Sequence, residues 1–184
     1  MITNIKIDTS RIGSQERKEK LERVAREMHQ VLNSTYFRDK VMLINPWGET
    51  SRWKTAGGKA IYQKIMSGAE SLDPSADNEL DIFVDDYFSW KGVIGYTYPN
   101  TKWIYVNTRF FDKRTTKLIG SNILHEYGHK LGFNHDFRST SRRPHSICYL
   151  LNRIYEQCYE KMFEFNAPAP NKIRVCYRSW RTGF

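Results

Sequence analysis

The sequence is poor in cysteine and has no long apolar run, and each absence excludes a class of protein. The three cysteines, Cys148, Cys158 and Cys176, are an odd number that implies no disulfide framework and fits a reducing compartment best. No stretch approaches the roughly 20 apolar residues of a membrane span. The N-terminal segment lacks the apolar centre of a secretory signal, so we expect no signal peptide and synthesis in the cytoplasm, or alternatively incorporation into a virion.

Acidic residues are outnumbered by basic ones, with 29 Lys and Arg against 20 Asp and Glu and a net charge of +9. The excess is concentrated in residues 137–184, which contain nine basic residues and three Glu. Such a surface favours an acidic partner or a larger assembly. Plain solubility is the simpler explanation, because no basic helix with base-reading residues and no aromatic stacking platform is evident. The length of 184 residues and the hydrophobic content of 40% fit one domain with its own core.

The most informative segment covers residues 125–136 and reads H-E-x-x-H-x-x-G-x-x-H-D. Residues four apart lie on the same face of a helix, so His125 and His129 can present two imidazoles to one metal ion. Glu126 follows the first of these ligands and can act on a water molecule at the metal. The H-E-x-x-H part alone is short enough to occur by chance on a surface helix.

The second half of the segment makes the pattern more specific. Gly132 allows the chain to leave the helix with a positive φ, and the turn can bring His135 back as a third ligand. Three protein ligands with an open fourth position are typical of a catalytic zinc site, whereas a structural site is closed. The complete spacing is the signature of the metzincins, and the chain therefore resembles a metzincin zinc metalloprotease.

This resemblance implies a fold as well as a site. We expect one α+β domain over residues 1–184, with an upper lobe of about 1–132 and a lower lobe of about 133–184. The upper lobe would hold a twisted mixed sheet, a backing helix and the active-site helix, and the lower lobe a C-terminal helix. In that family the substrate pairs antiparallel with the edge strand of the sheet, which by position is 92–98 here.

Hydrophobic periodicity, capping residues and local composition place the individual elements. An amphipathic helix is predicted over 14–33, where Leu21, Val24 and Met28 recur at helical spacing. The other predicted helices cover 59–66, 115–131 and 146–165. The predicted strands cover 2–7, 41–44, 79–88, 92–98 and 103–111.

The chain departs from the metzincin pattern in the turn that follows the third ligand. The family has a methionine beneath the zinc, often in the sequence Ser-x-Met, and the best match is Ser-Ile-Cys at 146–148. We expect Cys148 to lie beneath the metal as a small apolar group, although a thiol there could also bind zinc or be oxidised. Some metzincins place a tyrosine two residues after the methionine. That tyrosine reaches the zinc. The corresponding position is Leu150 here, so we do not assign this role to Tyr149.

Three further polar residues are expected outside the metal site. Asp136 matches an acidic residue that several metzincin families have after the third ligand, and we expect it to tie the lower lobe by hydrogen bonds. His145 is expected at the surface or in a structural role, and His29 shows no site pattern.

The resemblance implies a zinc-dependent endopeptidase that acts on a protein or peptide substrate. The implied Zn2+ ligands are His125, His129 and His135, and the implied catalytic base is Glu126. One alternative is a gluzincin, whose third ligand would be Glu156 or Glu160 on the following helix. Another alternative is a structural or binding component of a larger assembly, for example a phage particle, that keeps the fold with little or no catalysis.

Overall fold

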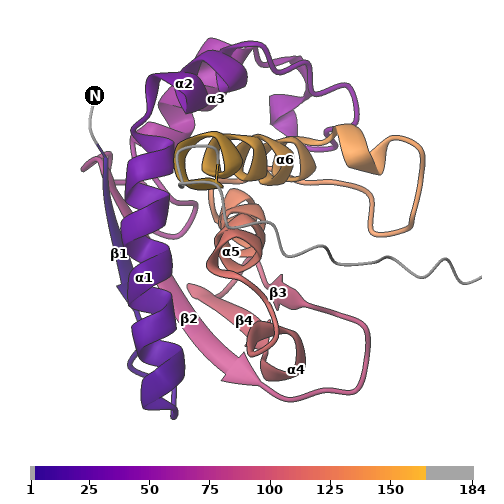
Figure 1. Ribbon diagram of the computed structural model, residues 1–184. Coiled ribbons are helices and arrows are strands. Elements are labelled where there is room, and N and C mark those ends of the chain that lie inside the picture. The colour runs from indigo at the N-terminus through magenta and orange to yellow at the C-terminus, as the bar shows by residue number, and fades with distance from the viewer. Residues whose placement is uncertain (1–2, 165–184) are drawn as a thin grey trace, which may run out of the picture.

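The described part of the chain has a mixed α and β architecture, with one four-stranded mixed sheet and six α-helices (Figure 1). The computed structural model describes residues 3–164. The end of the predicted last helix, Cys176 and the basic residues beyond 164 lie outside this range. Of the helices described, none combines the length and the apolar composition needed to cross a bilayer.

The strands are ordered β1-β2-β4-β3 across the sheet. Their bounds are β1 (Asn4–Asp8), β2 (Glu79–Tyr87), β3 (Gly95–Thr97) and β4 (Trp103–Asn107). β1, β2 and β4 are parallel, and β3 is antiparallel to β4. The predicted edge strand is thus at the edge of the sheet, but it is shorter than predicted. The side-chain amide of Asn107 donates to the backbone oxygen of Val93 at 3.0 Å, which holds the residues before Gly95 in a loop.

One face of the sheet is covered by helices α1 (Gln15–Leu32) and α5 (Thr116–Lys130), as Figure 1 shows. Side chains alternate between the two faces of a strand, and Leu80, Ile82 and Val84 of β2 point into this buried layer. The opposite face of the sheet carries pairs of aromatic side chains. Their members lie apart in the sequence, so the sequence did not show that they are in contact. Their members are Phe83 with Trp103, Tyr87 with Tyr96, and Tyr96 with Tyr105.

The first helix confirms its prediction. The side chain of Ser14 accepts a hydrogen bond from the backbone N–H of Arg17 and caps the helix, which is a common role of serine at this position. The buried stripe of α1 consists of Leu21, Val24, Met28, Val31 and Leu32. This stripe packs on β1 and α5, so α1 is the backing helix of the sheet.

One predicted strand is wrong, and another is confirmed only in its first part. Residues 41–44 were predicted as a strand, but helix α2 (Thr35–Met42) extends into them. Ser34 caps α2, and Phe37 and Val41 lie four residues apart on its buried side. The strand predicted over 103–111 ends at Asn107, whose side chain caps the short helix α4 (Thr108–Phe111). In both cases a capping side chain begins a helix where the composition is typical of a strand.

The remaining helices agree more closely with their predictions. Helix α3 covers Gly58–Met66, and short 3-10 helices cover Arg52–Thr55 and Arg143–His145. Helix α6 covers Ile147–Tyr159 and continues into a π-helical turn at Glu160–Glu164.

Helix α6 lies across α5 in Figure 1, and glycines of α5 let the two helices approach closely. A Cβ atom at Gly120 would lie 2.4 Å from the hydroxyl oxygen of Tyr155. A Cβ atom at Gly128 would lie 2.9 Å from Sγ of Cys148. The start of α6 is thereby brought against the part of α5 that contains the motif.

Candidate functional site

Helix α5 supplies the first half of the site. Thr115 caps its start by accepting a hydrogen bond from the backbone N–H of Leu118. The helix then runs unbroken to Lys130, so His125 and His129 project from one face a single turn apart.

The end of α5 has the geometry that returns the chain toward the same face. Gly132 has a φ of 91°. Its N–H donates to the oxygen of His129 at 3.1 Å, and the N–H of Phe133 donates to the oxygen of Gly128 at 3.0 Å. These two bonds form a Schellman motif, in which glycine is preferred because it has no Cβ atom to strain the backbone. The reversal brings His135 back toward the helix.

The three histidines of the motif converge. Their ligand atoms all lie within 4.8 Å of one another, and Nε2 of His125 is 3.2 Å from Nε2 of His135. Nδ1 of His129 lies 2.9 Å from the oxygen of Phe133, and Nδ1 of His135 lies 3.0 Å from the oxygen of Asp136. A carbonyl oxygen accepts, so each Nδ1 is assigned as the donor. Both Nε2 lone pairs are then free for a metal ion.

The protonation of the cluster also suits a metal. Burial lowers the pKa of His125 to about 3, and the neighbouring His129 and His135 act in the same direction. Burial likewise lowers the pKa of His129 and of His135. The imidazoles are therefore neutral at pH 7, the form that binds a metal. The three histidines could hold a metal ion, and imidazole nitrogens suit several divalent transition metals.

Glu126 lies beside the first ligand and lines the same cleft as the histidines. Its side chain is buried, and this burial raises the pKa of its carboxyl to about 7, against the opposing effect of Lys130 and Arg143. A carboxyl group with a pKa near neutrality exchanges protons readily in both directions, which is the property that a general acid–base catalyst needs.

The cleft is a hollow of about 510 Å³ between the edge strand, α5 and the segment that leads into α6. On the strand side it is lined by residues 92–97, which include β3. On the opposite side is Tyr149, whose ring centre is 4.5 Å from that of His125 and 5.0 Å from that of His135. The sequence assigned no role to Tyr149, yet the structure places it against two of the histidines.

Cys148 lies against the triad, as predicted. Its side chain is fully buried, and Sγ is 3.7 Å from Nδ1 of His129. This contact is on the side of the ring away from Nε2, and Cys148 does not belong to the ligand cluster. Burial raises the pKa of the Cys148 thiol, which keeps it neutral and favours packing over metal binding.

Glu49 is a buried residue of the site region that sequence reasoning missed. Its carboxylate accepts hydrogen bonds from the backbone N–H groups of Ser51 at 3.2 Å, Asn134 at 2.5 Å and Ile147 at 3.1 Å. It therefore joins a distant loop to the segment before His135 and to the first residue of α6. No local pattern could reveal this role, because two partners lie 85 and 98 residues away in the sequence.

The other expected polar residues have the following places. Asp136 accepts a hydrogen bond from Oγ1 of Thr140 at 2.6 Å and closes the loop after the third histidine, as predicted. His145 stacks on Trp47 with ring centres 4.2 Å apart, which is a structural role. His29 lies on α1, outside the cluster.

The two candidate ligands of the gluzincin alternative have other partners. Glu156 accepts a hydrogen bond from Ser121 at 2.6 Å, and Glu160 forms an ion pair with Lys117 at 3.0 Å. Neither belongs to the ligand cluster, so the described residues give this alternative no third ligand.

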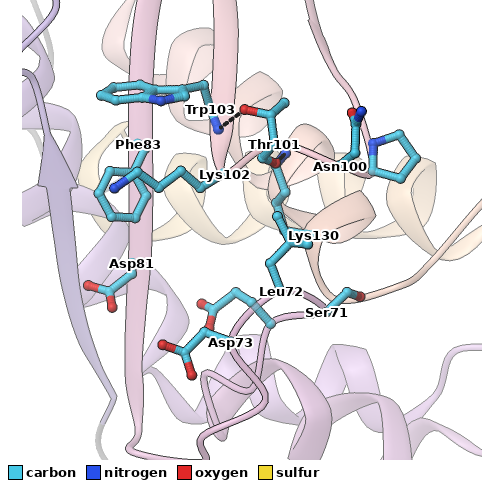
Figure 2. Close-up of a pocket in the computed structure, with 12 residues that line it drawn as sticks. Ser71, Leu72, Asp73, Asp81, Phe83, Asn100, Thr101, Lys102, Trp103 and Lys130 are labelled. Atoms are coloured by element: carbon cyan, nitrogen blue, oxygen red, sulfur yellow. Dashed lines mark hydrogen bonds between the residues drawn. The ribbon is translucent and has the colours of Figure 1, made fainter.

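A second hollow, of about 490 Å³, borders the sheet face that the helices leave uncovered. Figure 2 shows the rings of Phe83 and Trp103 at one end and Asp73 at the other. Lys130 lines it too, but its ammonium group donates to the backbone oxygen of Thr101. None of the histidines or Glu126 lines this hollow, so the triad cleft is the candidate site.

In comparisons with known proteins, no family model matches the chain, and no curated protein resembles its sequence at a significant level. The functional argument therefore depends on the residues of the cleft.

Proposed function

We propose that this protein is a zinc-dependent endopeptidase of the metzincin type. The observation that carries the proposal is the meeting of His125, His129 and His135 in one cleft with a buried glutamate, Glu126. Three imidazoles and no fourth protein ligand among the described residues correspond to a catalytic zinc site. On this proposal the residues from about 133 onward form the lower lobe, and Cys148 takes the place of the family's methionine.

When bound in such a site, zinc supplies Lewis acidity, which lowers the pKa of water and polarises a carbonyl group. The residues of the chain do the rest. Glu126 takes a proton from the attacking water and returns it to the nitrogen of the leaving amine. Its burial favours the protonated carboxyl that the second step needs, and its position next to His125 would place it beside a metal held by the three histidines.

The edge strand supports a peptide as the substrate. β3 pairs with β4 along one side and lies at the end of the sheet order, and residues 92–97 line the cleft. An extended peptide added to such an edge gains backbone hydrogen bonds without a requirement for a particular side chain. The geometry therefore favours an endopeptidase over a hydrolase of small molecules.

The test is the cleavage of a peptide library by the zinc-loaded protein, read by mass spectrometry. Glu126→Gln is the matched control, because it keeps the size and the polarity of the side chain and removes the base. We expect cleavage by the wild type alone, with equal zinc content in both proteins. Equal cleavage by the two proteins would refute the role of Glu126. A zinc-loaded wild type that cleaves no peptide would favour a structural or binding component instead.

A further inference from the structure

Arg143 is the single basic residue among the described residues that line the triad cleft. Its guanidinium carbon lies 5.2 Å from the centre of the Tyr149 ring, which in turn contacts the ring of His125. Its Nη1 donates to the backbone oxygen of Phe137 at 3.2 Å. The guanidinium is therefore held in place, one aromatic ring away from the metal ligands.

This guanidinium forms no direct ion pair with any described residue, and its charge acts on the carboxyl of Glu126 only from a longer distance. Its Nε is buried and without a hydrogen-bond partner. None of the ion pairs that the described residues form includes Arg143. Arg17 is the contrast, since it pairs with Asp86 and Asp112 at 2.8 Å each. A buried donor without a partner costs free energy, so the fold retains an unsatisfied group at Arg143.

The other charges of the cleft leave this arginine available. Glu126 is the sole carboxylate among the described lining residues, and Asn122, Tyr149 and Asn152 are neutral and polar. A divalent cation on the three neutral imidazoles would add further positive charge. A peptide with a negative side chain therefore matches the cleft better than a neutral or basic one.

We propose that Arg143 forms an anion subsite that selects peptides with an acidic side chain close to the scissile bond. The inference rests on the proposed function and deepens it by naming the substrate class. The guanidinium donates to the carboxylate while Nη1 keeps its bond to Phe137, and the planar fork of arginine matches a carboxylate geometrically. Because Nε is buried by the protein itself, the proposed bonds to the carboxylate come from the Nη groups.

The experiment measures binding separately from hydrolysis. Two fluorescein-labelled pools of capped peptides, identical except for Glu or Gln at each central position, are titrated into the zinc-loaded Glu126→Gln variant. We expect the Glu pool to bind about tenfold or more tightly than the Gln pool. Adding Arg143→Gln should bring this ratio close to one, and Arg143→Lys should retain part of it. Arg142→Gln is the matched control, since Arg142 is exposed, adjacent in the sequence and outside the cleft.

A ratio within one variant is insensitive to partial misfolding, because a damaged fold weakens both pools alike. Equal binding of the two pools by the parent variant would overturn the inference, as would an unchanged ratio after Arg143→Gln or no binding of either pool. Failure of the proposed function is a separate result, namely a wild type that cleaves neither pool. A Glu preference that disappears with Arg143 would still support the subsite in that case.

Discussion

Helix α5 and the segment from Gly132 to Cys148 both contribute to the triad cleft, but they are held in position in different ways. The helix carries two histidines and Glu126 on a frame of its own hydrogen bonds. The segment carries the third histidine and is held by bonds from elsewhere, above all by the buried carboxylate of Glu49. The helix therefore contributes chemistry that depends little on distant residues, whereas the segment contributes a ligand whose position depends on the tertiary structure.

The largest effect is expected from a substitution that removes the chemical contribution of α5 and leaves the segment from Gly132 to Cys148 intact. Glu126→Gln should lower the rate of peptide hydrolysis by about 10²- to 10⁴-fold, because it removes the general base. Zinc content, measured by atomic absorption, should stay at the wild-type level, because Glu126 is outside the ligand cluster. Loss of zinc in this variant would instead assign the carboxylate a structural duty.

The corresponding change on the side of the segment is Glu49→Ala. It removes the acceptor of three backbone N–H groups, two of which flank the third ligand region. We expect the free energy of unfolding, from urea titration, to fall by about 3 kcal/mol or more. Zinc affinity in a competition assay should fall as well. Glu49→Gln is the matched control and should lose less, because its amide oxygen still accepts. A Glu49→Ala protein as stable as the wild type would contradict the view that the segment is held in position by Glu49.

The stability of the metal-free protein should depend on pH through Glu126, because this carboxyl is buried on α5. Its carboxyl has a pKa of about 7 in the fold, against an ordinary value of 4.5. The folded state therefore binds more protons than the unfolded state between these values, and this group lowers stability as pH rises through that window. With chelator present, Glu126→Gln should gain about 3 kcal/mol relative to the wild type between pH 4.5 and pH 8. A difference that stays constant across this range would show that Glu126 is solvated.

The smallest effect tests the contact at which helix and segment meet. Gly128→Ala places a Cβ atom 2.9 Å from Sγ of Cys148, so the Cys148 side chain or one of the two helices must shift. We expect a loss of about 1–3 kcal/mol in the free energy of unfolding, measured by urea titration. The double variant Gly128→Ala, Cys148→Ala should recover part of this loss, because the clashing sulfur is gone. Strictly additive losses would mean that the two residues do not touch.

Local sequence was sufficient for much of the fold and for the three candidate metal ligands. The 3.6-residue periodicity of α1 and α6 predicted these helices, because each buries one stripe against the sheet or against another helix. Prediction was wrong at α2 and at the end of β4. There the capping side chains of Ser34 and Asn107 determined the backbone, although the composition around them was typical of strands.

The sequence by itself determined the three histidines and the neighbouring glutamate, because helical spacing and the αL conformation of Gly132 are local properties of the chain. The tertiary structure decided which residues surround them. Tyr149 reaches the cleft because α6 packs closely on α5 at Gly128, and Arg143 lines it from the short 3-10 helix before α6. Glu49 holds the segment before His135 from a loop far away in the sequence. Such contacts depend on which surfaces pack together, and a linear pattern of residue types does not contain that information.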